Sequence, residues 1–428
     1  MKPSVKEKTN AVRKAKVRAA DNGRKRAENV DIGPGDLLPR LKDQGYAAER
    51  VGQRRAWVEN KIGVSLRHIG SHSFDPEQMR GNIENPVGVA QVPLGVAGPV
   101  LVRGRHARGL FYVPMATTEG ALIRSYERGM VALTRAGGVE TALLADENQI
   151  APTFFFGSVH AAQKFTEWAP QQLTEMQAVA ATTTRHGKMT SVKCYQIGRQ
   201  VIVNFGFATG DAQGMNMIVK AADAVCKWIQ ERNPASSYLV FSGLCSEKRA
   251  SGFVMTRGKG KRVTAGALVP HEVLKLYLHV TAEQLFQVWH STVIGHLQAG
   301  AIGYNAHYAN GLAAIFIATG QDVANVVNAA CGITSFELHP DGLFASVTLP
   351  ALTVATIGGG TGLPTQREAL EMMGCYGAGK AKKFAEIVAA AVLGGEISMG
   401  AAMASGEFVA AHERYGRNRP NKTVISDK

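Results

Sequence analysis

The chain has 428 residues, of which 45% are hydrophobic and 19% are charged, and its formal net charge is +14. This length predicts about three domains, and the composition excludes a disordered, collagen-like or coiled-coil protein as a description of the whole chain. The five cysteines stand singly without a C-x-x-C pair, so we expect neither a disulfide framework nor a structural zinc site.

The first 30 residues hold half of the net positive charge, because they contain ten Lys or Arg residues and three acids. They are also poor in large apolar side chains, so we predict a disordered basic tail over residues 1–38. Such a tail could bind nucleic acid or anionic lipid, or it could act as a solubilising extension. A transit peptide is less favoured because of the acids. Since no apolar signal core begins the sequence, we expect a cytoplasmic protein.

The N-terminal half mixes helical and extended patterns. Helical spacing runs from about residue 39 to 69, whereas the prolines and glycines of residues 82–103 favour short strands and tight turns. The later elements predicted in this half are a helix over 115–134, a helix over 161–168 that could extend to 180, and strands over 191–197 and 200–205.

The C-terminal half is richer in helices. The small and apolar helical stretch 380–411 is interrupted by Glu396 and Glu407, so we expect no membrane span. The other elements predicted here are an amphipathic helix over Asp211–Arg232, extended segments at 239–254, 262–269 and 337–357, a mostly helical region over 271–330, and a helix at 366–373. Strands and helices that do not strictly alternate predict an α+β or mixed α/β fold.

Several familiar motifs fail when their full pattern is required. Residues 374–380 read GCYGAGK, but Ala381 stands where a phosphate-binding loop needs a hydroxyl for magnesium, so a glycine-rich turn before a helix is the better interpretation. His271 and Glu272 lack the second histidine of a zinc protease. The sequence also lacks a G-x-S-x-G elbow and a G-x-G-x-x-G followed by an acid, so an ordinary Rossmann site is not supported.

Three charged side chains stand where chemistry could use them. Glu119, in Thr117–Gly120, could cap the following helix, or it could donate a proton if apolar surroundings raise its pKa. Lys248 follows an apolar strand and could stabilise an oxyanion, or it could belong to a solvated charge cluster with its neighbours. Asp322 interrupts an apolar stretch, so it is either a helix N-cap or a functional acid coupled to a lysine.

Two further positions leave similar alternatives open. The small residues of Asp211–Met217 precede a helix, whose free N–H groups could bind a pyrophosphate, but Asp211 could also be the helix N-cap. His412 lies on a terminal segment, where it could be a mobile proton donor or an ordinary exposed histidine.

Taken together, these segments resemble the catalytic region of the 3-hydroxy-3-methylglutaryl-CoA (HMG-CoA) reductase family. The likeness covers roughly residues 50–418 and follows the class I-like form shared by eukaryotes, archaea and some bacteria. We expect no counterpart of the membrane anchor of animal members. The segments that carry the resemblance are Glu84–Gly88, Pro93–Pro99, Val113–Gly120, Asp211–Met217, Gly303–His307, Gly320–Asp322 and Gly358–Thr361.

The resemblance implies a large substrate-binding domain, an inserted ferredoxin-like NADPH-binding domain and a helical N-terminal segment, within an α+β (mixed α/β) fold. It also implies a homodimer or higher homo-oligomer with the active site at the subunit interface. The domains that follow for this sequence are 39–97 (helical N-terminal), 98–151 with 241–404 (large), 152–240 (inserted) and 405–428 (mobile C-terminal segment).

The activity implied by the resemblance is the reduction of HMG-CoA to mevalonate and CoA by NADPH in two hydride transfers. Glu119 matches the glutamate that protonates the aldehyde oxygen, and Lys248 matches the lysine that stabilises the thioester oxyanion. Asp322 matches the aspartate that tunes their pKa values, and His412 matches the histidine that protonates the departing CoA thiolate. These roles agree with the chemistry, because hydride delivery builds negative charge on oxygen.

The resemblance also implies the binding residues. Arg185 offers a forked donor for the 2′-phosphate, so NADPH is expected rather than NADH. No metal is expected. The implied cofactor-binding residues are Arg185, Asp211, Gly214, Met215 and Asn216, and the implied substrate-binding residues are Ser242, Arg249, His307 and Asn310.

A few positions depart from the family pattern. An arginine and a lysine of the HMG pocket of the animal enzyme fall on about Ile150 and Ser291 here, and the family's Asp-Lys-Lys reads Glu247-Lys248-Arg249. A reductase of another 3-hydroxyacyl-CoA thioester therefore stays open as an alternative. A second alternative is an inactive homologue that binds nucleic acid through the basic tail.

Overall fold

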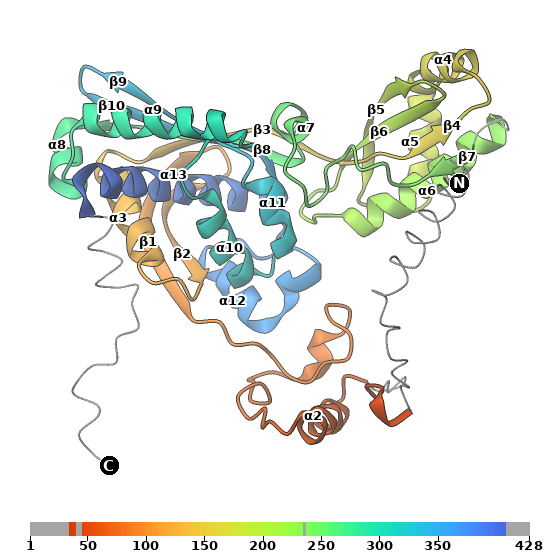
Figure 1. Cartoon of the computed structure of the whole chain (residues 1–428), viewed down its shortest axis with the longest axis horizontal. Coiled ribbons are helices and arrows are strands. Elements are labelled where there is room, and N and C mark those ends of the chain that lie inside the picture. The colour runs from red at the N-terminus through yellow and green to blue at the C-terminus, as the bar shows by residue number, and fades with distance from the viewer. Residues whose placement is uncertain (1–33, 40–44, 234–236, 408–428) are drawn as a thin grey trace, which may run out of the picture. The chain divides into compact units, whose positions relative to one another are not determined.

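The computed structural model describes residues 34–39, 45–233 and 237–407. The chain divides into two compact units, residues 1–90 and 91–428, and each unit is described by itself (Figure 1). Most of the predicted basic tail and His412 lie outside the described residues.

The first unit is built around one amphipathic helix. The ordered elements of this unit are the 3₁₀ turn η1 (Pro34–Asp36), the helix α2 (Ala48–Ile62) and the 3₁₀ turn η2 (Pro76–Met79). Helix α2 ends well before residue 69 because Gly63 takes a left-handed conformation with φ 71°. Arg54 is only 2% exposed and donates hydrogen bonds to the carbonyl oxygens of Gly45 and Pro86, at 3.3 and 2.6 Å. Burial lowers the pKa of Arg54, and these bonds tie both ends of the unit to α2.

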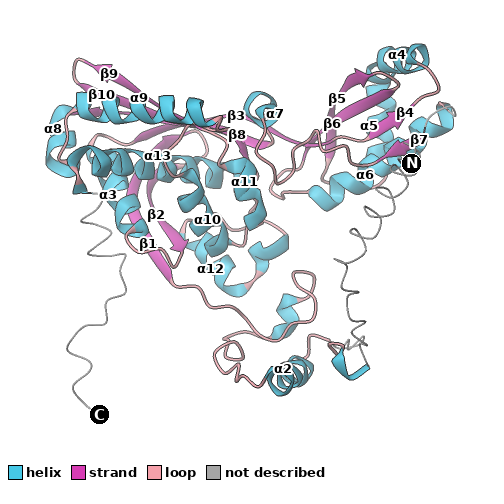
Figure 2. Ribbon diagram, in the orientation of Figure 1, coloured by secondary structure: helices cyan, strands magenta, loops and turns pink. Residues whose placement is uncertain are grey.

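The second unit contains a mixed sheet, drawn in magenta in Figure 2. The strands are paired in the order β7-β4-β6-β3-β8-β10-β9, β1 lies beside β2 and β3, and β5 lies beside β6. The long strand β3 joins two regions, because its residues 140–147 pair with β8 and its residues 148–150 pair with β6. The strands are β1 (Leu94–Gly104), β2 (Arg108–Ala116), β3 (Val139–Ile150), β4 (Thr153–Phe155), β5 (Lys188–Ile197), β6 (Gln200–Ala208), β7 (Ser237–Leu239), β8 (Gly260–Pro270), β9 (Ile333–His339) and β10 (Gly342–Leu352).

The helices of the second unit flank this sheet. The α-helices are α3 (Leu122–Arg135), α4 (Val159–Trp168), α5 (Leu173–Ala181), α6 (Met215–Arg232), α7 (Gly252–Arg257), α8 (His271–Val273), α9 (Ala282–Ala299), α10 (Tyr308–Thr319), α11 (Val326–Ala329), α12 (Pro364–Met372) and α13 (Ala381–Ser405). The shorter turns are η3 (Ala169–Gln172), the π-helical η4 (Leu274–Leu278), η5 (Val323–Asn325) and η6 (Gly359–Gly362).

Helix α13 is the central helix of the large core. By length and composition it could cross a membrane, but 78% of its most apolar window is buried inside the protein. It packs so closely on α3 that a Cβ atom added to Gly129 would lie 1.8 Å from the carbonyl oxygen of Gly394. Only glycine permits that approach, so these two residues fix the distance between the two helices.

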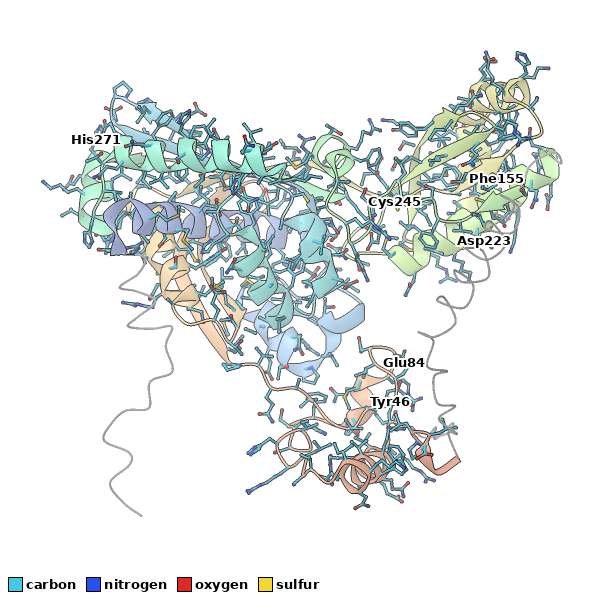
Figure 3. All side chains as sticks on the ribbon, viewed as in Figure 1. Tyr46, Glu84, Phe155, Asp223, Cys245 and His271 are labelled. Atoms are coloured by element: carbon cyan, nitrogen blue, oxygen red, sulfur yellow. The ribbon has the colours of Figure 1, made fainter. Side chains whose placement is uncertain are left out.

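The second unit has two main hydrophobic clusters. The larger one surrounds α13 and includes side chains of α3, α10, β8 and β10. The other is made by residues between 150 and 229, with Phe154, Phe165 and Phe205 among its buried aromatic side chains. Phe155 and Asp223, labelled in Figure 3, belong to the elements around this second cluster. The division into a large and an inserted ferredoxin-like domain stays a prediction.

The predicted mixed α/β class is confirmed, but three predicted elements differ. The helix predicted from residue 115 begins at Leu122, because Met115 and Ala116 still pair with β1. The helix predicted from Asp211 begins at Met215. The extended segment predicted over 239–254 is mostly wrong, because β7 ends at Leu239 and the short helix α7 begins at Gly252.

Candidate functional site

The clearest pair of predicted site residues is Lys248 with Asp322. The Lys248 Nζ atom lies 2.8 Å from Oδ2 of Asp322, and the two side chains are 46% and 35% exposed. The other carboxylate oxygen of Asp322 accepts a hydrogen bond from the backbone N–H of Ala324, at 3.2 Å, and caps η5. The predicted cap and the predicted pairing with a lysine are both present, because one carboxylate caps a helical turn and binds Lys248, and the catalytic role of Asp322 stays a prediction.

Lys248 is held in an unusual backbone conformation. Ser246 and Lys248 have φ values of 49° and 57°, in the left-handed region that non-glycine residues seldom adopt. The turn is closed by the Arg249 N–H, which donates to the carbonyl of Ser246 at 3.2 Å, and by the hydroxyl of Ser251, which donates to the Ser246 hydroxyl at 2.7 Å. Strain of this kind persists only where the surroundings hold it, and it gathers at functional sites.

Glu119 contacts a different predicted site residue, Asn310. It lies exposed in the loop between β2 and α3, and the side-chain amide of Asn310 donates to both of its carboxylate oxygens, at 3.0 and 2.8 Å. Helix α3 has no side-chain cap, so the capping interpretation of Glu119 is wrong. Asn310 lies in the first turn of α10, which puts an acid of the β2–α3 loop in a fixed place beside that helix.

The two pairs stand at opposite ends of α10. Asn310 lies in its first turn, whereas Asp322 follows Gly320, the residue that ends the helix. The helix has 12 residues, which corresponds to about 18 Å. Within one chain, the structure therefore brings Lys248 to Asp322 and Glu119 to Asn310, at separate ends of the same helix.

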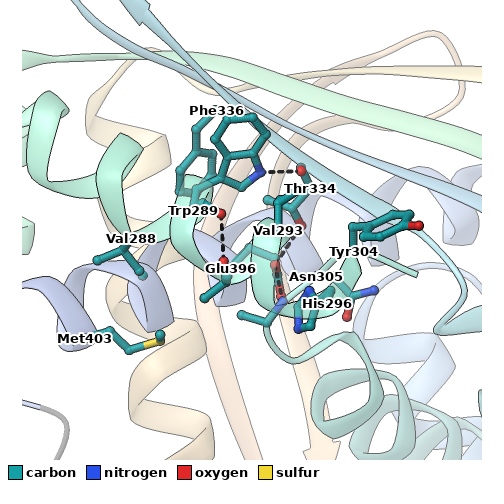
Figure 4. A pocket seen from close by; sticks show the side chains of 13 residues that line it. Val288, Trp289, Val293, His296, Tyr304, Asn305, Thr334, Phe336, Glu396 and Met403 are labelled. Atoms are coloured by element: carbon teal, nitrogen blue, oxygen red, sulfur yellow. Dashed lines mark hydrogen bonds between the residues drawn. The ribbon is translucent and has the colours of Figure 1, made fainter. Parts of the chain in front are cut away.

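The segment before α10 is fixed from behind by a buried acid. The backbone N–H groups of Ala306 and His307 donate to the Glu396 carboxylate, both at 2.8 Å, and the Thr334 hydroxyl donates to it at 2.6 Å. Figure 4 shows this carboxylate lining a pocket beside His296. Glu396 is 3% exposed, so these donors compensate for the loss of its hydration.

His307 is buried against an aromatic ring. It is 5% exposed and stacks on Tyr126 with ring centroids 5.2 Å apart. Burial, followed by the nearby Glu396 carboxylate, raises the pKa of Tyr126 well above its ordinary value, so the phenol stays neutral. Neither ring nitrogen of His307 has a hydrogen-bond partner in the described part of the chain, and Nδ1 lies 3.8 Å from Oε1 of Glu396.

The predicted cofactor segment starts α6 without a side-chain cap. The N-cap is Gly214, with φ 76°, and an added Cβ atom would lie 2.7 Å from Thr209. Asp211 does not cap this helix, so that interpretation is wrong. Its carboxylate instead accepts hydrogen bonds from the N–H groups of Gly379 and Ala381, at 2.7 and 3.0 Å, at the start of α13. The free N–H groups of α6 remain available to an anion.

The remaining cofactor residues lie around the same helix start. The amide of Asn148 lies 3.5 Å from the sulfur of Met215, and Asn216 is exposed one residue further along α6. Arg185 is exposed in the loop after α5. This loop returns to α6 at Gly187, where an added Cβ atom would lie 3.0 Å from Met217. The fold therefore brings the Arg185 loop to the start of α6.

Two predicted substrate-binding residues donate hydrogen bonds to backbone carbonyl groups. The hydroxyl of Ser242 donates to the carbonyl of Ala151 at 2.7 Å, which ties the segment after β7 to the end of β3. The exposed Arg249 donates to the carbonyl of Glu247 at 3.3 Å. His412 lies outside the described residues, so its predicted role stays a prediction.

The chain is similar to known proteins over most of its length. The family model described as hydroxymethylglutaryl-coenzyme A reductase matches residues 50–417. The chain belongs to this reductase family. It is 46% identical over 374 residues to the 3-hydroxy-3-methylglutaryl-coenzyme A reductase of Pyrococcus abyssi. This alignment covers 85% of this chain and 92% of that protein. The protein of the same name from Methanocaldococcus jannaschii is 41% identical over 392 residues, or 90% and 97% of the two chains.

Solved structures of the reductase family share the fold. A class II 3-hydroxy-3-methylglutaryl-CoA reductase from Streptococcus pneumoniae, bound to NADPH in open conformations, matches with a TM-score of 0.63 at 19% identity. The match covers 84% of this chain and 99% of that one. A second structure of the Streptococcus pneumoniae reductase gives 0.62 at 20% identity and covers 82% and 96%.

Two buried charged residues that support the site of this reductase, Glu396 and Lys259, were not predicted from the sequence. Glu396 stands out there only as an interruption of an apolar helix. The available signal was the same in both cases: a charged residue inside an apolar or glycine-flanked segment must have a partner, because an unpaired buried charge is costly. The sequence could show that such a partner exists but could not show which residue it is.

Proposed function

We propose that the chain is an NADPH-dependent HMG-CoA reductase that forms mevalonate and CoA by two hydride transfers. The observation that carries this proposal is the ion pair between Lys248 and Asp322, at the positions where the family motifs require a lysine and an acid. An ammonium group held at a fixed place stabilises an oxyanion without having to reorganise during the reaction.

The proposed roles follow from charge and proton demand. Lys248 would face the oxygen on which negative charge develops, and Asp322 would keep that ammonium group oriented. Glu119, oriented by Asn310, would supply a proton to the aldehyde oxygen, and His412 would protonate the CoA thiolate. NADPH supplies the hydride in each reduction.

The residues around α6 fit a phosphate-bearing cofactor. The uncapped helix start at Gly214 offers N–H donors and the positive end of the helix dipole. The exposed guanidinium of Arg185 suits a 2′-phosphate, and the loop that carries it contacts the same helix through Gly187. We therefore assign Arg185, Asp211, Gly214, Met215 and Asn216 to the cofactor site, with Asp211 acting through its contacts to the start of α13.

The reductase is proposed to act in the cytoplasm as a homo-oligomer with a shared active site. The separation of the Glu119–Asn310 pair from the Lys248–Asp322 pair supports this, because a second copy could bring one pair opposite the other. A class I-like form is also proposed. It is supported by the low identity, 19%, between this chain and the class II structure.

A second candidate is a reductase of another 3-hydroxyacyl-CoA thioester. Ile150, at one position where the animal enzyme carries a cation, is fully buried in the second hydrophobic cluster. An apolar residue there gives no charge to a substrate carboxylate. The two candidates can be separated by comparing kcat/KM for HMG-CoA with kcat/KM for a 3-hydroxyacyl-CoA that lacks the terminal carboxylate. A higher kcat/KM for HMG-CoA supports the first candidate.

The direct test replaces Lys248 by methionine, which keeps the length of the side chain and removes its charge. We expect turnover of HMG-CoA to fall by about a thousandfold or more. Lys227→Met is the matched control, because Lys227 also pairs with an aspartate at 2.8 Å, on the surface of α6. Full turnover by Lys248→Met would contradict the proposed mechanism.

A further inference from the structure

A buried lysine stands directly behind the loop that carries Lys248. The Lys259 side chain is 0% exposed, and its Nζ atom lies 2.8 Å from Oε2 of Glu247. The same ammonium donates to the carbonyl oxygen of Gln149, on β3, at 3.1 Å. Glu247 is the residue immediately before Lys248, so one buried cation joins the site loop to the central strand.

The backbone of Lys259 is fixed independently of this ion pair. Its neighbours Gly258 and Gly260 have φ values of 76° and 69°. An added Cβ atom on Gly258 would lie 2.8 Å from the carbonyl oxygen of Pro350, to which the N–H of Lys259 donates at 3.2 Å. The two glycines let the chain bend closely around β10, so the ammonium extends from a rigid base.

Glu247 also contacts the predicted cofactor segment. The side-chain amide of Gln213 lies 3.5 Å from Oε1 of Glu247, and the carbonyl of Gln213 accepts a hydrogen bond from Asn148 at 2.8 Å. Gln213 directly precedes Gly214, the first residue of the uncapped helix start. The carboxylate of Glu247 therefore lies between Lys259 on one side and the cofactor segment on the other.

A buried ion pair is weak evidence for stability, because the cost of removing two charges from water offsets most of their attraction. An apolar pair could fill the same space, whereas a carboxylate fixed by an ammonium and a neighbouring amide has a defined position. We propose that Lys259 is a positioning residue that acts through Glu247 to hold Lys248 against Asp322. It thereby also fixes the position of Lys248 relative to the cofactor segment. This inference rests on the proposed function of Lys248.

The chain offers a matched comparison two residues further along, on β8. Lys261 is 3% exposed, and its Nζ atom lies 3.2 Å from Oδ1 of Asp146, the residue opposite it in the β3–β8 register. It also donates to the carbonyl of Gly210 at 3.3 Å. Lys261 thus has the burial and the partner type of Lys259 but has no contact with the loop of Lys248 among its described interactions.

The kinetic test compares Lys259→Met, Lys259→Arg and Lys261→Met in the full chain. We expect Lys259→Met to lower kcat for HMG-CoA by about ten- to a hundredfold while both KM values change by less than about threefold. Lys259→Arg should recover most of the loss, because it restores the charge. Lys261→Met should keep kcat per folded molecule. Equal kcat losses in the two methionine variants, or an unchanged kcat in Lys259→Met, would overturn the proposal.

A second measurement does not depend on turnover. The rate at which an amine-specific reagent labels Lys248, followed by mass spectrometry, reports how tightly its Nζ atom is held against Asp322. We expect Lys259→Met to label at Lys248 at least about threefold faster than wild type, with Lys261→Met unchanged. Unchanged labelling in Lys259→Met overturns the positioning role even if the wild type fails to reduce HMG-CoA, which separates this result from failure of the proposed function.

If Lys259→Met does not fold, Glu247→Gln gives the same test from the other partner. It removes the charge that Lys259 holds and keeps a side chain that reaches Gln213. We expect the same loss of kcat and the same faster labelling of Lys248. Wild-type values for both measurements in Glu247→Gln would overturn the proposal.

Discussion

Helix α13 carries two buried glutamates, and each accepts hydrogen bonds from the backbone N–H groups of a different loop. Glu386, 0% exposed, accepts hydrogen bonds from the N–H groups of His106 and Ala107, in the turn between β1 and β2. Glu396, 3% exposed, accepts from Ala306 and His307. Ten residues of helix separate the two acids, or about 15 Å.

The two acids hold different loops, and Glu396 also accepts a hydrogen bond from the Thr334 hydroxyl. The β1–β2 turn contains no predicted site residue, whereas the segment held by Glu396 contains His307 and leads into Asn310. A buried carboxylate that binds backbone N–H groups is therefore a device for fixing a loop, and its functional importance depends on what the loop carries. This comparison separates contributions to folding from contributions to catalysis.

The largest expected effect comes from removing each acid in turn. Glu386→Ala and Glu396→Ala should each lower the free energy of unfolding by about 2 to 5 kcal/mol, because two backbone N–H donors, one of them buried, lose their acceptor. Only Glu396→Ala should also lower kcat, by about a hundredfold, because a displaced site segment misplaces reacting groups. Urea denaturation gives the first quantity, and steady-state kinetics under conditions where both variants are folded gives the second.

The proposed difference between the two acids is contradicted if Glu386→Ala loses as much kcat per folded molecule as Glu396→Ala. That outcome would mean that loss of rigidity anywhere along α13 impairs the site. The difference is also contradicted if Glu396→Ala keeps full activity, because the segment before α10 would then hold its position without the carboxylate.

A smaller effect on kcat is expected at Asn310, which follows the segment held by Glu396. Asn310→Ala removes both hydrogen bonds to Glu119 but should leave stability nearly unchanged, because Glu119 is exposed. We expect kcat to fall by about tenfold as the proton donor loses its orientation. Gln163→Ala is a suitable control, because Gln163 donates to Glu167 at 3.1 Å on the exposed face of α4. A fall in kcat for the control, or none for Asn310→Ala, would contradict this account.

The smallest effect is expected at a carboxylate on the surface. The hydrogen bond from Lys227 lowers the pKa of Asp223 below its ordinary value near 3.8, and Tyr238 also donates to it at 2.9 Å. A lowered pKa gives stability that is present above pH 4 and is lost as the pH falls through that lowered value. Asp223→Asn should therefore lower the Tm by no more than about 2 °C at pH 7.

The pH dependence of this small effect is the sharper measurement. The difference in Tm between wild type and Asp223→Asn should shrink towards zero as the pH falls below 3. A difference that grows on acidification would contradict the sign of the pKa shift. A loss at pH 7 as large as that of Glu386→Ala would contradict the contrast between buried and exposed acids.

Much of the site could be predicted from the sequence because its motifs are local. Lys248, Asp322 and Glu119 each lie near a glycine or polar residues within apolar surroundings, and this pattern can be read directly from the sequence. Their pairing is not visible, since it depends on contacts between segments far apart in the chain. The sequence left cap and functional acid as alternatives for Asp322, and the structure shows that one carboxylate serves as a cap and also pairs with Lys248.

The errors have a common physical cause. The apolar run after Leu239 predicted a strand, but the turn at Ser246 and Lys248 takes left-handed backbone conformations that only tertiary contacts maintain. One interpretation had Asp211 cap its own helix, yet its carboxylate bonds to the start of α13, at Gly379 and Ala381. Local propensity cannot predict contacts of this kind, because the partners come from distant parts of the chain.

The central claim is the four-electron reduction of HMG-CoA, and the count of NADPH consumed tests it most directly. Purified full-length protein is incubated with HMG-CoA and excess NADPH, and mevalonate, free CoA and oxidised cofactor are quantified together. The account predicts two NADPH oxidised for each mevalonate and each CoA released. No HMG-CoA-dependent oxidation, or one NADPH per CoA with an aldehyde as the final product, would contradict it.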